Sequence, residues 1–340
     1  MLAVEDLNKV EAVYQKIKES QKILLVSHIN PDIDAVASIS FFIEILKQEN
    51  KKFLAFAEGK GDDYYFLAHE DQIISSKDEL AKKINLDKDF LRYFDLIIVL
   101  DCGSLGRTSL EEEITNIKDL MLDTFVVEID HHVPDKSYAN IEIKIPLSST
   151  TEILYHVAKT NNIEINRNLA NCILAGILTD TANFMYPSTS SDTIKIAAEM
   201  MAQGAQFPKL LNHTWRNKSL AEMKLWGLAL SNLKINEKYN IAFSVLPYND
   251  IKDLKGSLGA DIFGDIAGFL SSLSEADITL LLREDSRGKI KGSLRVGASN
   301  NQSLDVNKLA RLFGGGGHKK ASGFMVEGSI IKKDNLFKVL

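Results

Sequence analysis

The stretch ILLVSHINPDID, residues 23–34, decides the fold of this chain. Its first four residues form a short, continuous apolar run, which is typical of a strand buried on both faces of a parallel sheet. Three side chains of metal-binding type, His28, Asp32 and Asp34, follow within the next few residues. The stretch therefore predicts a buried strand that ends in a loop carrying an imidazole and two carboxylates.

Two further apolar runs end in the same way. Residues 96–100 lead directly into Asp101, and residues 125–129 lead into the triplet Asp-His-His at residues 130–132. In open α/β sheets, ligands bind beyond the carboxyl ends of the strands. We therefore expect the polar side chains of all three segments to meet at one edge of a parallel sheet.

Helical patterns separate these runs and follow them. Those at residues 36–47 and 79–84 favour a βαβ layout. The sequence at residues 149–152, Ser-Thr-Thr-Glu, has the spacing of a capping box and predicts a helix over residues 153–160. Residues 169–178 are apolar, and periodicity alone leaves open whether they form a buried helix or a strand.

The second half of the chain changes in composition. Residues 190–233 are rich in Ala, Met, Leu, Glu and Lys, which favours helical connecting segments. Strands are predicted at residues 239–246, 278–282 and 289–296, so a second, smaller α/β domain is expected there. The predicted boundaries are 1–189 for the parallel-sheet domain, 190–233 for the helical connector and 234–340 for the second domain.

Composition limits the classes of function. The length of 340 residues indicates two domains. The composition, 45% hydrophobic and 25% charged residues, is that of a globular protein. The net charge is -6 and no long Lys/Arg block is present, so long duplex nucleic acid is not an expected partner. A small anionic substrate fits better.

Targeting signals are not expected. The amino terminus carries Glu5 and Asp6 and has no apolar stretch after a basic one, so we expect no secretory signal and a cytoplasmic protein. No run of about 18 apolar residues suggests a membrane span. Cys102 and Cys172 lie in separate apolar stretches and are expected to be reduced and buried.

The residues at the strand ends suit metal chemistry. The imidazole of His28 with the carboxylates of Asp32 and Asp34 suits manganese, iron or zinc. The alternative is that one aspartate caps the next helix and that His28 has only a packing role. Adjacent imidazoles at His131 and His132 are harder to explain by packing, and Asp130 is the expected carboxylate partner that orients them.

A second motif lies near the carboxyl terminus. Four glycines at residues 314–317 precede His318 and permit close backbone approach, so we expect them to form a nest of amide donors for an anion. A flexible turn is the alternative. Arg295, at the end of a predicted strand, could bind a phosphate through two hydrogen bonds, although a surface arginine is the default interpretation.

Together these segments resemble the DHH phosphoesterase superfamily, named for the triplet found here at residues 130–132. Residues 28–34 resemble its first motif, Asp101 its second and Asp180 its fourth, and the glycine loop with His318 resembles the DHH-associated domain. The chain length is closest to the NrnA-like branch. That branch degrades very short oligoribonucleotides (nanoRNA) and removes the 3′-phosphate of adenosine 3′,5′-bisphosphate (pAp), so short RNA or DNA oligonucleotides and pAp are the expected substrates.

The resemblance implies a role for each residue. Two divalent cations, with manganese expected, would be held by two ligand sets. Asp101 would bridge the ions. Asp101, Asp130 and His132 would act as catalytic residues, and His132 would contact the substrate phosphate. Arg295, Gly315, Gly316, Gly317 and His318 would bind the far end of the nucleotide. The implied ligand sets are His28, Asp32 and Asp101 for one ion and Asp34, His131, Asp180 and Asp101 for the other.

We therefore expect hydrolysis of a phosphoester by a two-metal hydroxide mechanism, in a chain that could form a homodimer. Two departures from the family pattern, Ile33 in place of glycine and Val296 in place of serine, leave substrate preference open. The rivals on this scaffold are a RecJ-like single-strand exonuclease, a cyclic or linear dinucleotide phosphodiesterase and an inorganic pyrophosphatase. The rival from another class is a nucleotide-binding regulatory protein without activity.

Overall fold

The computed structural model describes residues 3–84, 93–119, 123–132, 137–216, 218–254, 258, 262–298, 303–333 and 336–339. The three apolar runs are strands in it, as predicted: β1 (Lys22–Val26), β4 (Leu96–Leu100) and β5 (Phe125–Asp130). They are adjacent and parallel, with β4 between β1 and β5. The polar segments that follow them therefore leave the sheet at the same edge.

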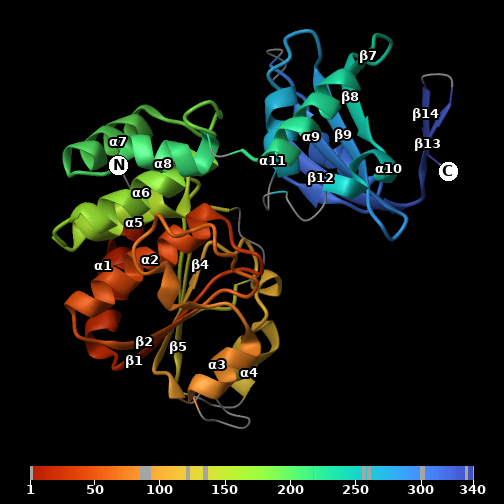
Figure 1. Cartoon of the computed structure of the whole chain (residues 1–340). Coiled ribbons are helices and arrows are strands. Elements are labelled where there is room, and N and C mark those ends of the chain that lie inside the picture. The colour runs from red at the N-terminus through yellow and green to blue at the C-terminus, as the bar shows by residue number, and fades with distance from the viewer. Residues whose placement is uncertain are drawn as a thin grey trace. The chain divides into compact units, whose positions relative to one another are not determined.

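The chain divides into two compact units, Met1–Asn217 and Lys218–Leu340 (Figure 1). The first contains the six-stranded parallel sheet, in the order β3-β2-β1-β4-β5-β6. The strands not yet introduced are β2 (Lys52–Phe56), β3 (Ile73–Ile74) and β6 (Ile141–Lys144). The expected α/β fold with a parallel sheet is confirmed.

Helices cover both faces of this sheet. Alternate residues of β1 show the two faces, because Leu25 packs with one hydrophobic cluster and Leu24 with the other. The helices of the first face are α1 (Val4–Glu19), α2 (Ile33–Gln48), α5 (Thr150–Thr160) and α6 (Arg167–Asp180). Those of the second are α3 (Lys77–Ile84) and α4 (Glu111–Asp119). The segment whose type periodicity left open is thus a helix, α6.

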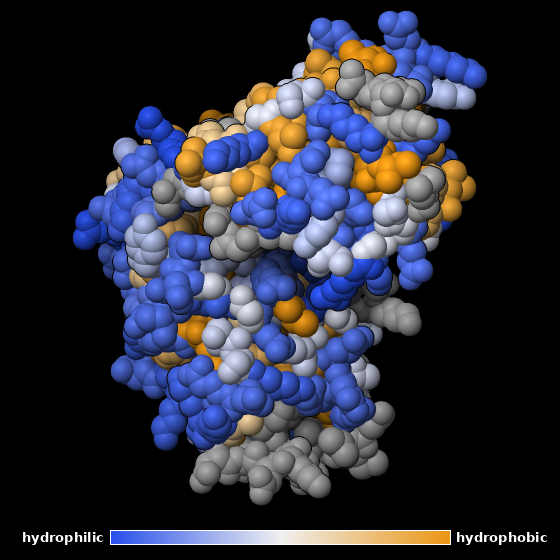
Figure 2. Space-filling model, turned by 45° about the vertical axis from the view of Figure 1, so that its right-hand side comes forward, coloured by the Kyte–Doolittle hydropathy of each residue, from blue (hydrophilic) through white to orange (hydrophobic). Residues whose placement is uncertain are grey.

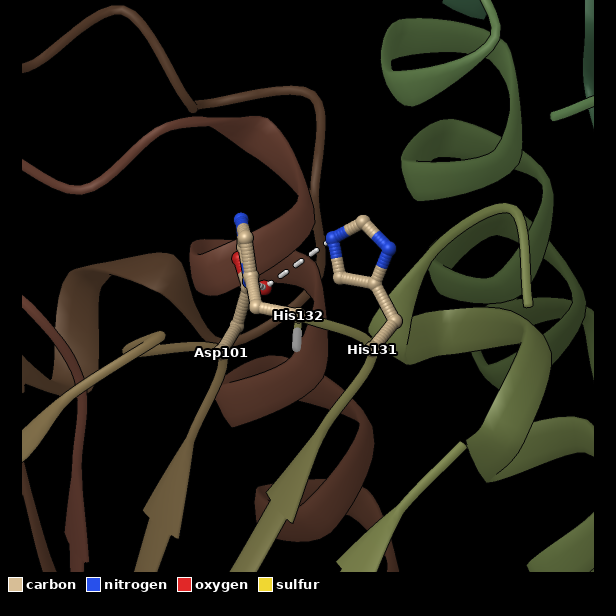
Figure 3. Close-up of side chains that lie close together, drawn as sticks. All are labelled: Asp101, His131 and His132. Carbon is tan, nitrogen blue, oxygen red and sulfur yellow. Dashed lines mark ion pairs between the residues drawn. The ribbon is translucent and has the colours of Figure 1, made fainter. Parts of the chain in front are cut away.

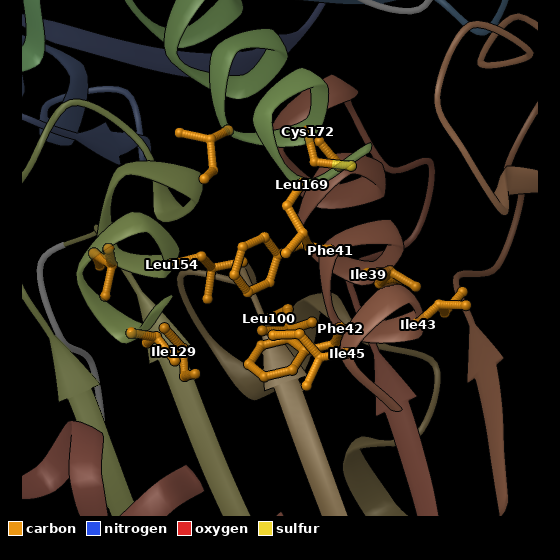
Figure 4. Packing of buried hydrophobic residues seen from close by; sticks show 14 of the residues in the cluster. Ile39, Phe41, Phe42, Ile43, Ile45, Leu100, Ile129, Leu154, Leu169 and Cys172 are labelled. Carbon is orange, nitrogen blue, oxygen red and sulfur yellow. The ribbon is translucent and has the colours of Figure 1, made fainter. Parts of the chain in front are cut away.

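The helix α2 is buried on nearly all sides, because the sheet lies below it and α6 packs on it from above (Figure 4). Phe41 and Phe42 are fully buried, and Leu100 and Leu169 belong to the same cluster. Burying an aromatic side chain of this size contributes roughly 1.5–3 kcal/mol. The packing fixes where α2 begins, and with it the loop that carries His28 and Asp32.

The connections after β1 and β4 run to opposite faces of the sheet. The chain leaves β1 into α2 on one face of the sheet and leaves β4 toward α4 on the other. Such a change of face between neighbouring parallel strands is where ligands bind in open α/β sheets. His28 follows β1 and Asp101 follows β4, so both lie at this point.

The second unit contains a mixed sheet in the order β11-β12-β10-β9-β8-β7, in which β8 and β9 are parallel and the other pairs are antiparallel. Its strands are β7 (Lys234–Asn236), β8 (Ile241–Leu246), β9 (Ile278–Glu284), β10 (Lys289–Val296), β11 (Gly316–Gly317) and β12 (Ala321–Glu327), and a separate hairpin is formed by β13 (Ile330–Lys333) and β14 (Leu336–Val339). Its helices are α9 (Leu220–Ser231), α10 (Tyr248–Ile251), α11 (Ile262–Leu270) and α12 (Val306–Arg311). A second, smaller α/β unit is therefore present.

Residues 190–233, the predicted connector, are largely helical where they are described. They contribute α7 (Ser191–Ala202), α8 (Phe207–Leu211) and the π-helical turn η4 (Asn212–Arg216) to the first unit and α9 to the second. Both cysteines are free and buried, as expected. In the described part of the chain, no helix has the length and apolar character needed to cross a membrane. The face shown in Figure 2 is largely hydrophilic, with hydrophobic residues in small groups.

Candidate metal centre

His28 lies in the loop after β1 with its ring almost fully buried. Its Nδ1 is 3.0 Å from the carbonyl oxygen of Ile29, so a neutral ring donates from Nδ1 and leaves Nε2 as an acceptor. Nε2 is buried and has no hydrogen-bond donor, while an oxygen of Asp32 lies 3.8 Å away. Burial lowers the pKa of His28 and keeps the ring neutral. A buried acceptor without a donor is costly, and a cation would satisfy it.

Asp32 has the helix-capping role that the sequence presented as the alternative to metal binding. It is the N-cap residue of α2, and its Oδ1 accepts a hydrogen bond of 3.0 Å from the amide of Ala35. Its other oxygen, Oδ2, is the one that faces His28. Helix capping therefore orients the carboxylate without occupying both of its oxygens.

Asp101 is buried at the end of β4, and its backbone adopts a left-handed conformation with φ 55°. This conformation is uncommon for a residue other than glycine and costs of order 1 kcal/mol or more, so the surrounding structure must impose it. Thr150 Oγ1 donates a hydrogen bond of 2.9 Å to Asp101 Oδ1. The same oxygen lies 3.6 Å from His131 Nε2 and 3.6 Å from His132 Nδ1 (Figure 3).

A second group of side chains consists of Asp34, His131 and Asp180. His131 Nδ1 is 3.4 Å from the carbonyl oxygen of Leu147, so a neutral ring would leave Nε2 as the acceptor. This Nε2 is buried without a well-aligned hydrogen bond, 3.1 Å from Asp180 Oδ2. Asp180 is the last residue of α6, where the helix dipole disfavours a carboxylate, so its position is better explained by a cationic partner than by helix stability.

Asp101 lies with His28 and Asp32, and its contact with His131 links the first group to the second, so the carboxylates of both groups concentrate negative charge in one place. Burial, together with neighbouring carboxylates, raises the pKa of three carboxyl groups: that of Asp34, that of Asp180 to about 8 and that of Asp101 well above its usual range. Burial opposes a charge on His131, but Asp180 and Asp101 outweigh it and raise its pKa well above the usual value. Divalent cations would neutralise the same charges. In three groups of these residues, the possible ligand atoms all lie within 4.8 Å of one another. The groups are His28 with Asp32 and Asp101, Asp34 with His131 and Asp180, and Asp101 with His131 and His132.

Asp130 lies below this centre and orients His132. Its Oδ1 accepts from the amide of His132 at 2.8 Å and lies 2.7 Å from Nδ1 of the same residue, and Oδ2 accepts from the amide of Gly103. Burial alone would raise the pKa of Asp130, but the hydrogen bonds from His132 and Gly103 lower it to about 2. The carboxylate is therefore ionised, and Nδ1 of His132 carries the proton between them.

Three residues that sequence reasoning missed hold the carboxylates in place. The amides of Thr150 and Thr151 donate to the two oxygens of Asp34 at 2.7 and 3.1 Å. Gly176 lies opposite, in α6, where a Cβ atom would be only 2.0 Å from Asp34 Oδ1 and 2.2 Å from Thr151 Oγ1. The predicted capping box marked the start of α5 correctly, and an isolated glycine inside an apolar helix is itself a signal of close packing.

The capping box forms only in part. Ser149 Oγ accepts from the amide of Glu152 at 3.0 Å, as predicted, but the Glu152 carboxylate accepts from Ser148 instead of returning to Ser149. The first two amides of the helix, those of Thr150 and Thr151, donate to Asp34. The amino terminus of α5 thus serves the centre as well as its own capping.

In the second unit, Arg295 and His318 lie at the same end of the sheet. Arg295 pairs with Ala321 across β10 and β12, and the amide of His318 donates to the carbonyl oxygen of Ala321 at 2.8 Å. The guanidinium of Arg295 also donates to the carbonyl oxygen of Leu294. The sequence alone could not show this proximity.

The glycines before His318 have different reasons to lack a side chain. A Cβ on Gly315 or Gly317 would meet the backbone of β12 at 2.2 and 2.7 Å, whereas a Cβ on Gly316 would meet nothing closer than 4.0 Å. The amides of Gly314, Gly315 and His318 donate to backbone carbonyls, so these three do not form the expected nest. An anion at this loop would bind to other groups.

The two departures from the expected motif are accommodated by packing. Ile33 is the first residue of α2 and lies against the main hydrophobic cluster, without the positive φ that would require glycine. Val296 ends β10 and packs on the cluster beside α12. Neither residue is itself a candidate metal ligand.

Comparison with known families agrees with this geometry. Residues 22–177 match the DHH family, N-terminal domain, and residues 239–340 match the DHHA1 domain. The chain belongs to the DHH family. The resemblance inferred from the motifs is thereby confirmed, and membership makes this DHH chain a phosphoesterase of a metal-dependent family.

Individual relatives resemble this DHH protein over nearly its full length. The bifunctional oligoribonuclease and PAP phosphatase NrnA of Bacillus subtilis is 27% identical over 315 residues, which are 88% of each chain. The solved structure of an exopolyphosphatase-related protein from Bacteroides fragilis is 25% identical, covers 93% of this chain and 90% of its own, and superposes with a TM-score of 0.81. RecJ of Thermus thermophilus, in complex with Mn²⁺, shares the fold at 13% identity and a TM-score of 0.53, and this chain covers 53% of it.

Proposed function

We propose that the chain hydrolyses short oligoribonucleotides and the 3′-phosphate of pAp with two divalent cations, manganese in the first place. The observation that carries the proposal is the pair of buried Nε2 atoms, on His28 and His131, that lack donors and face two carboxylate groups joined by Asp101. NrnA of Bacillus subtilis, similar over most of the chain, supports the choice of substrates.

The candidate ligands fit divalent cations by charge and by atom type. His28 and Asp32 would hold one ion, Asp34, His131 and Asp180 the other, and Asp101 both. When bound, such ions activate water for attack and neutralise the phosphoryl oxygens. Mixed imidazole nitrogen and carboxylate oxygen ligands suit manganese.

The remaining residues of the centre act on the substrate. Asp130 stays ionised and fixes the ring of His132, so that this ring presents its outer edge toward a phosphate in a single orientation. In the second unit, the side chains of Arg295 and His318 would bind an anionic group of the substrate, and the loop of Gly315, Gly316 and Gly317 would let it approach the backbone. Gly316 is the glycine whose missing side chain the fold itself does not require, which suits close approach of a ligand.

The test is a parallel manganese-dependent digestion of pAp, a dinucleotide, a five-residue RNA, a long single strand, a cyclic dinucleotide and inorganic polyphosphate. We expect hydrolysis of the first three, and loss of it in Asp101→Ala. Polyphosphate is included because the chain is similar to the exopolyphosphatase-related protein. Preference for the long strand, the cyclic dinucleotide or polyphosphate would replace the proposed substrate class.

Binding of pAp without hydrolysis of any of the six substrates would favour the regulatory protein. Gel filtration of the same preparation tests whether the chain forms a homodimer. Neither result depends on the other, because the proposed ligands all come from one chain.

A further inference from the structure

Arg107 ends the short helical turn η3 (Leu105–Arg107), which lies between β4 and α4. Its carbonyl oxygen accepts a hydrogen bond of 2.9 Å from the amide of Ile29, so its backbone ties this segment to the loop after β1. Its side chain returns to the loop after β4, where Nη1 donates to the carbonyl oxygen of Cys102 at 3.1 Å. One residue thus joins the two loops that carry His28 and Asp101.

The guanidinium of Arg107 lies beside the ring of His132. A Cβ on Gly103, whose φ is 69°, would be 3.2 Å from Arg107 Nη1 and 3.6 Å from His132 Cγ. Both side chains therefore lie within about 4 Å of the same point. Glycine at position 103 leaves the space between them open.

The electrostatics of the centre call for a cation at this place. The proposed ligands include four carboxylates, whose charge two divalent ions would balance, and Asp130 adds a further negative charge beneath His132. The positive charge of Arg107 acts on the centre, since it adds to the effect of burial in lowering the pKa of His28. A phosphate that enters the centre brings negative charge that the ligand set leaves uncompensated.

We propose that Arg107 binds a non-bridging oxygen of the substrate phosphate beside His132 and so positions it for hydrolysis. The inference rests on the proposed function and adds a substrate-positioning residue within the first unit. Arginine suits the role because its planar fork can keep Nη1 on the carbonyl of Cys102 while its other N–H groups point elsewhere. The side chain is exposed, which a purely structural bond to that carbonyl would not require.

The test compares Arg107→Gln and Arg107→Lys with the unmodified protein and with Arg167→Gln. Arg167 is also exposed, but it begins α6, whose opposite end carries Asp180. We expect Arg107→Gln to raise the KM for pAp and the inhibition constant of inorganic phosphate by about 10-fold or more, since it removes a charge-assisted hydrogen bond to the phosphate. Arg107→Lys should raise both about 3-fold or more, because it keeps the charge but not the fork, and Arg167→Gln should change neither.

Calorimetric binding of inorganic phosphate to the manganese-loaded protein gives a readout that is independent of turnover. If Arg107→Gln keeps the KM and the phosphate affinity of the unmodified protein, the proposal is overturned. Should that variant fail to fold, unchanged constants in Arg107→Lys overturn it equally. A protein that hydrolyses no substrate but loses phosphate binding in Arg107→Gln would contradict the proposed function and keep this assignment.

Discussion

The two candidate ligand groups, for which we propose Asp101 as a common ligand, are assembled in different ways. The group of His28 and Asp32 comes from one short loop, and the Asp32 side chain is 53% exposed. The group of Asp34, His131 and Asp180 is gathered from three distant segments, and Asp34 is fully buried against the amides of α5. The first group depends on local geometry, and the second depends on how α5 and α6 pack on α2.

This difference predicts that substitutions in the packing of α5 and α6 damage the second group selectively. The first group should survive them, because the N-cap of α2 and the carbonyl of Ile29 orient its side chains from within the loop. Substitution of the shared residue should damage both groups. The expected effects fall in size from the shared carboxylate to the strained backbone beyond Asp180.

The largest effect is expected for Asp101→Asn. Turnover of pAp should fall by about two to three orders of magnitude, because the change removes the charge of the carboxylate that we propose as a ligand of both ions. The fold should be retained, since an asparagine oxygen can still accept from Thr150 Oγ1. Rates with manganese in excess, together with the melting temperature, check this. Undiminished turnover in a folded variant would exclude Asp101 as the shared ligand.

Gly176→Ala tests the second group alone. The new Cβ would overlap Asp34 and Thr151, and overpacking of this kind costs roughly 1–3 kcal/mol of unfolding free energy. We expect denaturant unfolding to show this loss and the bound metal, measured by mass spectrometry, to fall from two ions to one. The matched control is Gly227→Ala in α9, where a Cβ meets nothing within 4 Å and a gain of up to about 1 kcal/mol is expected. Equal effects at both positions would contradict the close-packing argument.

The sequence offered candidate ligands for both groups, but local spacing explains the proximity of the residues only in the first. His28 and Asp32 are close in the chain and follow a buried strand, so the loop alone places them together. The contact of Asp34 with Thr150 joins residues 116 positions apart and depends on helix packing that no local pattern encodes. The parallel sheet was predictable because its strands are continuous apolar runs. The helical nature of the segment before Asp180, and the role of Gly176, were not.

The third prediction concerns the metal-free protein and pH. Burial and neighbouring carboxylates raise the pKa of Asp180 to about 8, so between its ordinary pKa of 3.8 and about 8 the folded state binds more protons than the unfolded state. Stability then falls as pH rises through that range. The raised pKa of His131 acts in the same direction. Melting temperatures in EDTA should therefore decrease from pH 5 to pH 8, and added manganese should reverse the trend.

A pH trend that is the same with and without metal would contradict this account of the charge cluster. The variant Asp180→Asn supplies the control, because it removes one titrating group. Its metal-free melting temperature should depend less on pH than that of the unmodified protein.

The fourth prediction separates metal support from helix capping in neighbouring residues. Thr150→Ala removes the hydroxyl that donates to Asp101, and loss of a hydrogen bond to a metal ligand typically lowers metal affinity by roughly 10- to 100-fold. Ser149→Ala removes the N-cap of α5 and should cost about 1 kcal/mol of stability, with a much smaller effect on affinity. Manganese titration and denaturant unfolding of both variants measure the two quantities. Similar metal affinities in the two would refute the division of roles.

The smallest effect is expected just beyond the second group, where Ala182, Asn183 and Phe184 are all left-handed. The first group has a single such residue in its loop, Asn30, a type that tolerates this conformation better than alanine does. Ala182→Gly should remove strain of about 1 kcal/mol and lose part of that gain to the greater freedom of the unfolded chain, for a net stabilisation of about 0.5 kcal/mol.

The control for this change is Ala202→Gly, at the exposed end of α7, where φ is not positive and a loss of up to about 1 kcal/mol is expected. Opposite signs for the two substitutions, measured by denaturant unfolding, would locate backbone strain next to Asp180. If both substitutions destabilise the protein, the methyl group of Ala182 stabilises the turn after α6 through its contacts, and the left-handed backbone of Ala182 stores no strain. The second group would then owe its position to packing alone, as α5 and Gly176 already suggest.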